Sequence, residues 1–224
     1  MIQISRGLRC VLTMAVTLTF GVGVALAQRA VVPSAAQIAQ SGQLTGSTYA
    51  NKSLGFTLSV PAEWNLASEE MNKAMLAAGG KTVVANEAGS RRKALEESLA
   101  KTAILFTLSR FPIGTAGNTG NLACGFERTP AGYTLSRYAN DNQSFLQKAI
   151  PGAKITKANY ATTIGGKPSL AFDLEAEQNG ALVRQRYYLM QRKGGMLFFV
   201  MTWSDEDDIK RGLDTAFDSI KFDK

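Results

Sequence analysis

The sequence contains no histidine and only two cysteines among its 224 residues. The absence of histidine excludes Ser-His-Asp and Cys-His catalysis, His-ligated zinc, and the commonest general base at neutral pH. Cys10 lies ahead of an apolar run near the N-terminus, so Cys124 is the only cysteine in the rest of the chain. A single cysteine can form neither an intramolecular disulfide nor a structural thiolate metal site. We therefore expect no metal and no cofactor, and we expect stability to come from an apolar core.

The first 27 residues have the order of a secretory signal peptide. Arg6 and Arg9 form a positive segment, Val11–Val24 an apolar segment, and Ala25-Leu26-Ala27 an A-x-A cleavage site. An uncleaved membrane anchor is the alternative, but the apolar segment is shorter than the roughly 20 residues that span a bilayer. The sequence therefore predicts export with cleavage near Ala27, to a periplasmic, lumenal or extracellular location.

The charge of the chain is moderately positive. The sequence has 25 basic and 18 acidic residues; removing residues 1–27 takes away two arginines and no acid, which leaves 23 against 18, a net charge of +5. Because this charge is dispersed along the chain, we do not expect a nucleic-acid partner. Acidic partners, or peripheral contact with an anionic membrane surface, are compatible with it.

The segment after the signal peptide differs in composition from the rest. Residues 28–47 are rich in Ala, Gln, Ser and Gly and have no sustained periodicity, which predicts a flexible linker. Residues 48–224 then form a single domain, long enough to bury a substantial core.

Residues 168–203 predict three strands joined by two tight hairpins. Asn179-Gly180 favours a type I′ turn, because that turn needs positive φ at both central residues. With this turn the numbers of opposed residues sum to 359. Two ion pairs then face each other across the hairpin: Asp173–Arg186 and Glu175–Arg184. A slip of one residue would move every side chain to the other face, so the agreement of charges supports the register.

The second hairpin turns at Lys193-Gly194-Gly195 and ends in the most apolar run that follows the signal peptide. A two-residue loop would place Trp203 opposite Arg184, and a four-residue loop would place it opposite Arg186. Residues 196–203 have hardly a polar side chain on either face, which predicts a central strand covered on both sides.

Periodicity and turn residues indicate the remaining elements. Further strands are expected at residues 55–60, 102–110 and 155–163. Helices are expected from Ser68 to Gly79-Gly80, at 90–101, at 134–150, and after the acidic segment 205–208. The basic residues 91–93 could receive an anionic ligand, but acids one turn away favour a solvated helix face. The fold expected is α+β: an antiparallel β-sheet of about six strands with helices on both faces, an α/β/α sandwich.

Tyr49, the segment GFTLSVPAEW at residues 55–64 and the helix start TLSRY at 134–138 resemble the PsbP-like family. The resemblance covers about residues 48–222, and its motifs are structural: a strand, a proline stop and a tryptophan that plugs the core. It implies a secreted or lumenal α/β/α sandwich that shares its fold with the Mog family of Ran-binding proteins. Members of the family serve mostly as accessory or assembly proteins, and the resemblance provides no catalytic residue.

A glycine-rich segment at residues 111–125 follows one of the predicted strands and is the candidate contact surface for a partner. The candidate contact residues are Phe111, Ile113, Asn118, Asn121 and Cys124. A plain surface connection is the alternative. Cys124 could be a reactive thiol, but the sequence near it shows no activating base, and a small, partly buried cysteine is the favoured interpretation.

Two functions are compatible with these features. The favoured one is an exported, non-enzymatic accessory or binding protein, whose partner is an envelope or membrane-associated protein. The alternative is a carboxylate-dependent hydrolase of the cell envelope, which would pair Glu63 with an acid of the segment 205–208.

Overall fold

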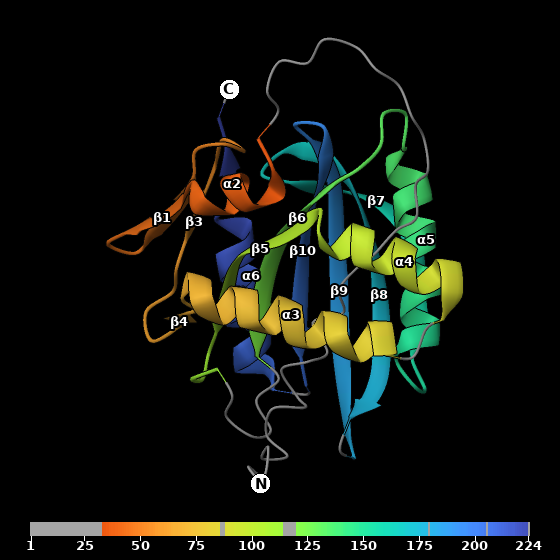
Figure 1. Ribbon diagram of the computed structural model, residues 1–224. Helices are drawn as coiled ribbons and strands as arrows, with labels where there is room; N and C mark the ends of the chain where they lie inside the picture. Colours follow the sequence, from red (N-terminus) through yellow and green to blue (C-terminus); the bar gives the residue numbers. More distant parts are fainter. Residues whose placement is uncertain (1–32, 86–87, 114–119, 179, 205, 224) are drawn as a thin grey trace, which may run out of the picture.

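The computed structural model describes residues 33–85, 88–113, 120–178, 180–204 and 206–223. These residues form two antiparallel sheets and five helices, an α+β fold (Figure 1). The helices are α2 (Ala35–Gln40), α3 (Glu69–Ala85), α4 (Gly89–Leu99), α5 (Leu135–Ala149) and α6 (Asp207–Asp218). Among the described residues, no helix is both long and apolar enough to cross a bilayer.

The large sheet has seven strands, and the small sheet has four. The large sheet is ordered β4 (Asn65–Leu66), β5 (Thr102–Ser109), β6 (Asn121–Arg128), β10 (Gly195–Trp203), β9 (Ala181–Arg192), β8 (Lys167–Gln178) and β7 (Lys154–Ile164). The small sheet is ordered β1 (Gly42–Thr45), β2 (Thr48–Asn51), β3 (Phe56–Ser59) and β11 (Lys221–Phe222). The fold class is as expected, but the single sheet of about six strands is not. The predicted strand at 55–60 pairs with its neighbour β2 and with the C-terminal β11, so it builds a second sheet.

The predicted hairpin register is confirmed. Asp173 pairs with Arg186 and Glu175 with Arg184 across β8 and β9, with shortest N–O distances of 2.7 and 3.1 Å. In the second hairpin Trp203 lies opposite Arg184, which selects the two-residue loop. Its two loop residues, Lys193 and Gly194, have φ angles of 49° and 74°, and such positive values at both positions are typical of a type I′ turn.

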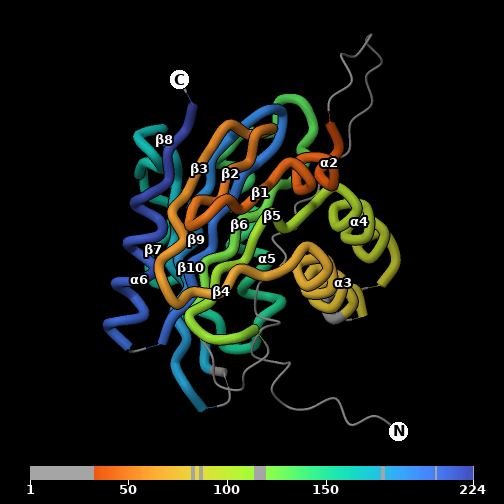
Figure 2. Tube along the Cα trace, turned by 90° about the vertical axis from the view of Figure 1, so that its left-hand side faces the viewer, coloured from red at the N-terminus to blue at the C-terminus, as the bar shows by residue number. Residues whose placement is uncertain are grey.

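Strand β10 lies in the middle of the large sheet and is buried on both faces, as its sequence predicts. Leu197, Phe199 and Met201 point into a core shared with the small sheet, α2 and α6. The alternate residues of β10 point into a second core, which contains side chains of α3, α4 and α5. In Figure 2, α3 and α4 lie on one side of the large sheet and α6 on the other. Helices therefore cover both faces, and the small sheet shares one face with α6.

Strand β7 forms one edge of the large sheet, and its pairing with β8 is irregular. The register shifts twice, between Ile155 and Lys157 and again between Lys157 and Tyr160. The opposite edge is β4, which has only two residues. The large sheet is thus bordered on one side by an irregularly paired strand and on the other by a very short one.

The segment predicted to be a flexible linker is largely ordered where the structure describes it. Ser34 caps α2: its hydroxyl accepts a hydrogen bond from the backbone N–H of Gln37, whose side chain accepts one from the N–H of Ser34. Ile38 is buried in the core, and β1 follows the helix. The guanidinium of Arg128 donates to the carbonyl of Pro33 at the start of this segment. Residues 28–32 lie outside the described part of the chain.

Helix α3 is longer than predicted, because it continues through Gly79-Gly80 to Ala85. Glycine usually weakens a helix interior, which is why the sequence predicted an end here. The structure gives a packing reason for Gly80: a Cβ atom at this position would lie 2.8 Å from a methyl carbon of Leu99 on α4. The glycine allows the two helices to approach each other closely.

The turn between β8 and β9 provides a test of the hairpin. Gly180 has φ of 80°, and a Cβ added there would meet nothing within 4 Å. Replacing Gly180 with Ala should therefore lower the free energy of unfolding by about 1–2 kcal/mol through backbone strain alone. Replacing Glu175 with Gln breaks an ion pair that is about one-third exposed, and should cost at most about 1 kcal/mol. Urea unfolding of both variants measures the difference; a larger loss for Glu175→Gln would contradict this account.

Candidate binding groove

The structure changes the position of several predicted contact residues. Asn121 and Cys124 belong to β6, so residues 121–125 are sheet and not loop. Phe111 is exposed and Ile113 is half-buried after the end of β5, whereas Asn118 lies outside the described residues. The predicted contact loop over 111–125 therefore extends too far: its last five residues, 121–125, belong to strand β6.

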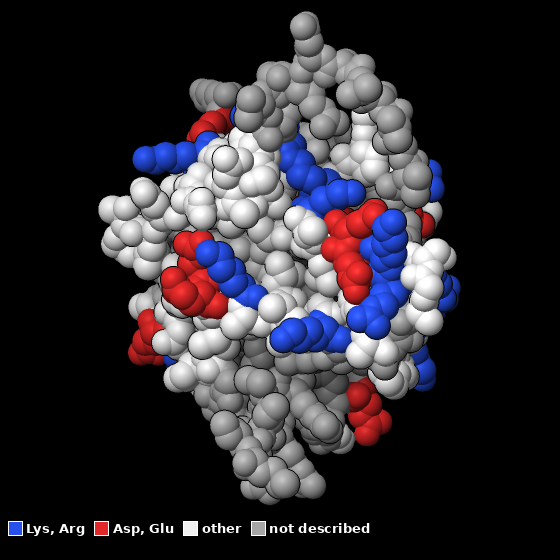
Figure 3. All heavy atoms as spheres, in the orientation of Figure 1, with Lys and Arg blue, Asp and Glu red and all other residues white. Residues whose placement is uncertain are grey.

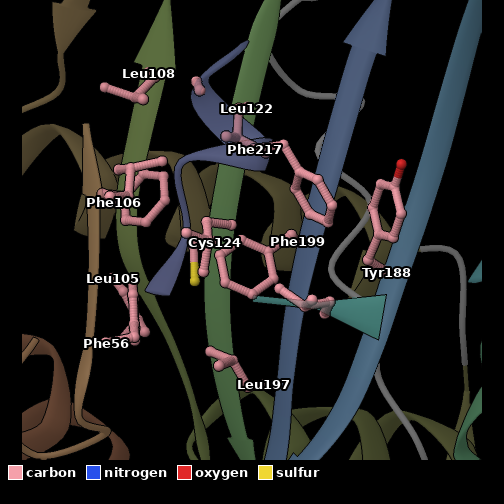
Figure 4. Close-up of a cluster of buried hydrophobic side chains, with 14 of the residues drawn as sticks. Phe56, Leu105, Phe106, Leu108, Leu122, Cys124, Tyr188, Leu197, Phe199 and Phe217 are labelled. Atoms are coloured by element: carbon pink, nitrogen blue, oxygen red, sulfur yellow. The ribbon is translucent and has the colours of Figure 1, made fainter. Parts of the chain in front are cut away.

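Cys124 lies in the centre of the first core and has no exposed surface. It is opposite Phe106 on β5 and Phe199 on β10, and Figure 4 shows the three side chains next to one another. Burial raises the pKa of its thiol well above the ordinary value, because charge is disfavoured in an apolar environment. Cys124 therefore fits the interpretation of a buried cysteine and not that of a partner contact.

A groove of about 440 Å³ lies between α3 and α4 on the face of the molecule shown in Figure 1. We call it the α3–α4 groove. It is lined by Lys73, Leu76, Ala77, Gly80, Lys81 and Val84 of α3 and by Arg92, Glu96 and Leu99 of α4. The α3 residues follow helical spacing, so they form one stripe along the helix. The charged lining residues are all exposed, whereas the apolar ones other than Ala77 are half-buried or buried, so the charges lie at the margins of the groove. Figure 3 shows basic and acidic side chains next to one another over this face, around an uncharged surface.

The cations at the margin of the groove differ in their partners. Lys73 pairs with Glu69 at 2.5 Å, and this hydrogen bond is the main reason why the pKa of Lys73 is raised. Arg92 pairs with Glu96 at 3.0 Å on α4. Lys81 is exposed and makes no ion pair with a residue that the structure describes. Lys81 is therefore the cation with the greatest capacity to receive an anionic group.

Buried polar contacts fix the two helices of the groove to the large sheet. On α3, the amide oxygen of Asn72 accepts a hydrogen bond of 2.8 Å from the hydroxyl of Thr107 on β5. On α4, the Ser98 hydroxyl donates to the carboxylate of Glu127 on β6 at 2.6 Å. The hydroxyl of Tyr138 on α5 donates to the other oxygen of Glu127 at 2.9 Å. Because all of these groups are buried, separating them would leave polar atoms unsatisfied. The two helices that form the walls of the groove are therefore fixed to the large sheet by these hydrogen bonds.

The residue types in the groove suit binding more than chemistry. The polar side chains among its described lining residues are three cations and one acid, and the acid is already paired with Arg92. Within the described ranges, no group of three or more acidic or cysteine side chains is placed to hold a metal ion. The groove can therefore hold an apolar group and attract a negative charge.

The described acids of the hydrolase alternative are exposed to solvent and have structural roles. Glu63 pairs with Arg110 at 3.1 Å, and its side chain is 74% exposed. Asp207 and Asp208 are exposed in the first turn of α6, where acids stabilise the positive end of the helix dipole. Asp205 lies outside the described residues. Nothing in these contacts favours a catalytic pair of carboxylates.

Sequence reasoning missed the groove because it ended the first helix at Gly79-Gly80. This end removed Lys81 and Val84 from the helix and broke the stripe that begins at Lys73. A usable signal was present in the sequence: small or apolar residues recur at 76, 77, 80 and 84, with lysines at 73 and 81. The solvated helix face predicted for residues 91–93 is confirmed: these residues are exposed, and Arg92 pairs with Glu96 one turn away.

The fold and site define an α+β protein with an apolar groove on a pair of helices, and comparisons with known proteins add little. No family model matches the sequence, and no curated protein matches it. The PsbP-like resemblance is therefore not confirmed.

Three solved structures are distantly similar. PA94, a protein of unknown function from Pseudomonas aeruginosa, is 16% identical with a TM-score of 0.39, over 53% of this chain and 80% of that one. LpqN of Mycobacterium tuberculosis, described as involved in cell envelope biogenesis, is 12% identical with a TM-score of 0.43, over 75% and 83% of the two chains. A protein from Bacteroides thetaiotaomicron is 11% identical with a TM-score of 0.43, over 81% of this chain and 50% of that one. At these scores the similarities carry no argument about function.

Burial of Cys124 predicts a loss of stability at alkaline pH. The folded chain holds the thiol proton more tightly than the unfolded chain, whose cysteine has a pKa of about 8.5. The contribution of the protonated thiol to the free energy of unfolding is fully present below that pH, and it is lost as the pH rises toward the pKa of the folded state. Between pH 7 and 9.5 this thiol should lower the free energy of unfolding by about 1 kcal/mol.

Urea unfolding of the wild type and of Cys124→Ala at both pH values tests this expectation. The variant is less stable throughout, because it loses packing in the core, but its stability should change less with pH. An equal loss in the two proteins would assign the alkaline effect to other groups.

Proposed function

We propose that this protein is an exported, non-enzymatic accessory protein of the cell envelope, and that it binds an apolar group of a membrane-associated partner in the α3–α4 groove. The observation that carries the proposal is the groove itself: a ligand-sized, mainly apolar depression with cations at its margin. Concave, mainly apolar sites with a few polar groups at their margin are where proteins usually bind small ligands. The function that the groove supports best is binding.

The charge of the groove and of the chain supports a partner at the membrane. Three cations, Lys73, Lys81 and Arg92, line the groove against one acid, Glu96, among the described residues. Lys73 and Arg92 are paired with acids, so the available positive charge is that of Lys81. This combination suits contact with anionic membrane components, since burial of apolar area and attraction to acidic headgroups act together. The net charge of +5 expected after cleavage acts in the same direction.

Export is inferred from residues 1–27, which lie outside the described part of the structure. Protein recovered from its native host should begin at Gln28, because the A-x-A sequence ends at Ala27. Intact-mass measurement of the fraction outside the cytoplasm checks this prediction. A full-length species that stays in the membrane would identify the N-terminal segment as an anchor.

Photo-crosslinking in cells tests the groove as the binding site. Ala77 is exposed and lines the groove, so a benzoylphenylalanine at this position should capture an envelope component, identified by mass spectrometry. The matched control carries the same side chain at Thr215, an exposed position on α6.

A second pair of variants tests whether filling the groove prevents binding of the partner. Ala77→Trp should fill the groove and abolish co-purification of the captured component, while Thr215→Trp should leave it unchanged. Both substitutions are on exposed helix positions, where we expect changes in stability within about 0.5 kcal/mol. Equal capture at Ala77 and Thr215, or capture that survives Ala77→Trp, would place the binding surface elsewhere.

A further inference from the structure

The shape of the α3–α4 groove restricts what it can hold. Leu76, Ala77 and Val84 of α3 face Leu99 of α4, and Gly80 lets the helices approach at the base of the groove. None of the described lining residues has an aromatic side chain that could stack on a sugar or a base. A groove between two helices that is lined mainly by aliphatic side chains is suited to an extended aliphatic chain.

The size of the groove indicates the length of that chain. A protein cavity of about 150 Å³ accommodates benzene, which has six carbon atoms. On the same scale, the volume of 440 Å³ corresponds to at most roughly eighteen carbons, because the groove is open to solvent on one side. This is the size of one long alkyl chain.

The cations determine the head group. Lys73, Ala77 and Lys81 are spaced four residues apart, so the two lysines stand at one edge of the stripe on either side of Ala77. Lys73 is already paired with Glu69, but Lys81 makes no ion pair with a described residue. A lysine can lay its aliphatic stem along an apolar surface and keep its ammonium in water. A negative head group would therefore meet Lys81 while the chain lies in the groove.

We infer that the α3–α4 groove binds a single-chain amphiphile with an anionic head, with the chain along Ala77, Gly80 and Leu99 and the head at Lys81. The inference rests on the proposed function and names the chemical class that occupies the same site. It distinguishes this ligand from a cationic amphiphile and from an apolar peptide segment, neither of which places a negative charge at Lys81.

Calorimetric titration of the exported protein with alkyl carboxylates tests the ligand class. Dodecanoate, tridecanoate and tetradecanoate, each used below its micelle concentration, should bind with an affinity that rises about fourfold for each added methylene. Dodecyltrimethylammonium has a chain of the same length and the opposite charge, and it should bind at least tenfold more weakly than dodecanoate. Equal binding of the two amphiphiles, or an affinity that does not depend on chain length, would overturn the inference.

Charge-reversal variants test the place of the head group. Lys81→Glu should weaken dodecanoate binding about tenfold, because it turns an attraction into a repulsion close to the head group. Lys93→Glu makes the same change at an exposed position of α4 that does not line the groove, and should alter the affinity less than twofold. Equal effects of the two variants would show that only the overall charge matters, and would overturn the inference.

The two proposals fail in different ways. Capture of an envelope protein at Ala77, combined with no measurable binding of dodecanoate, would leave the accessory function standing and overturn the ligand class. Binding of dodecanoate that responds to Lys81→Glu, combined with equal capture at Ala77 and Thr215, would overturn the proposed accessory function and support the ligand class.

Discussion

The burial of β10 on both faces is the constraint on which the rest of the structure depends. Every side chain from Met196 to Met201 is apolar, so the strand is stable only if both faces of the sheet are covered. One side is covered by the small sheet and α6, and the other by α3, α4 and α5. The groove is a consequence of this arrangement. A pair of helices that covers a sheet buries only part of its own surface, and the remaining stripe between the helices faces outward.

Much of this fold could be predicted from local patterns. The turn signal Asn179-Gly180 and the charges of Asp173 and Glu175 predicted the register of one hairpin correctly, because only one alignment satisfies both. The pattern did not decide between loop lengths in the second hairpin, since a shift of two residues keeps every side chain on its own face. The four-stranded sheet was missed because its strands are four residues or shorter, and their pairing depends on tertiary contacts, such as the hydrogen bond from the Tyr49 hydroxyl to the Leu105 carbonyl.

The site was harder to predict than the fold. Local propensity correctly treats a pair of glycines as unfavourable in a helix, but it contains no information about a neighbouring helix that needs the space. Gly80 is explained only by Leu99, which is on a different helix. The same holds for Glu127, whose position in the sequence gives no sign that hydroxyls from two helices converge on it. Contacts between elements that are distant in sequence decided where the groove lies and how firmly its walls are held.

The irregular pairing of β7 has a consequence for contacts between molecules. A long edge strand with regular pairing exposes a row of unpaired N–H and C=O groups, on which a strand from another molecule can add. The two register shifts between Ile155 and Tyr160 bend this edge, and Lys154 and Lys157 place charge along it. The opposite edge, β4, is too short to act as a template. Neither end of the large sheet therefore favours edge-to-edge aggregation, even though its central strands are among the most apolar parts of the chain.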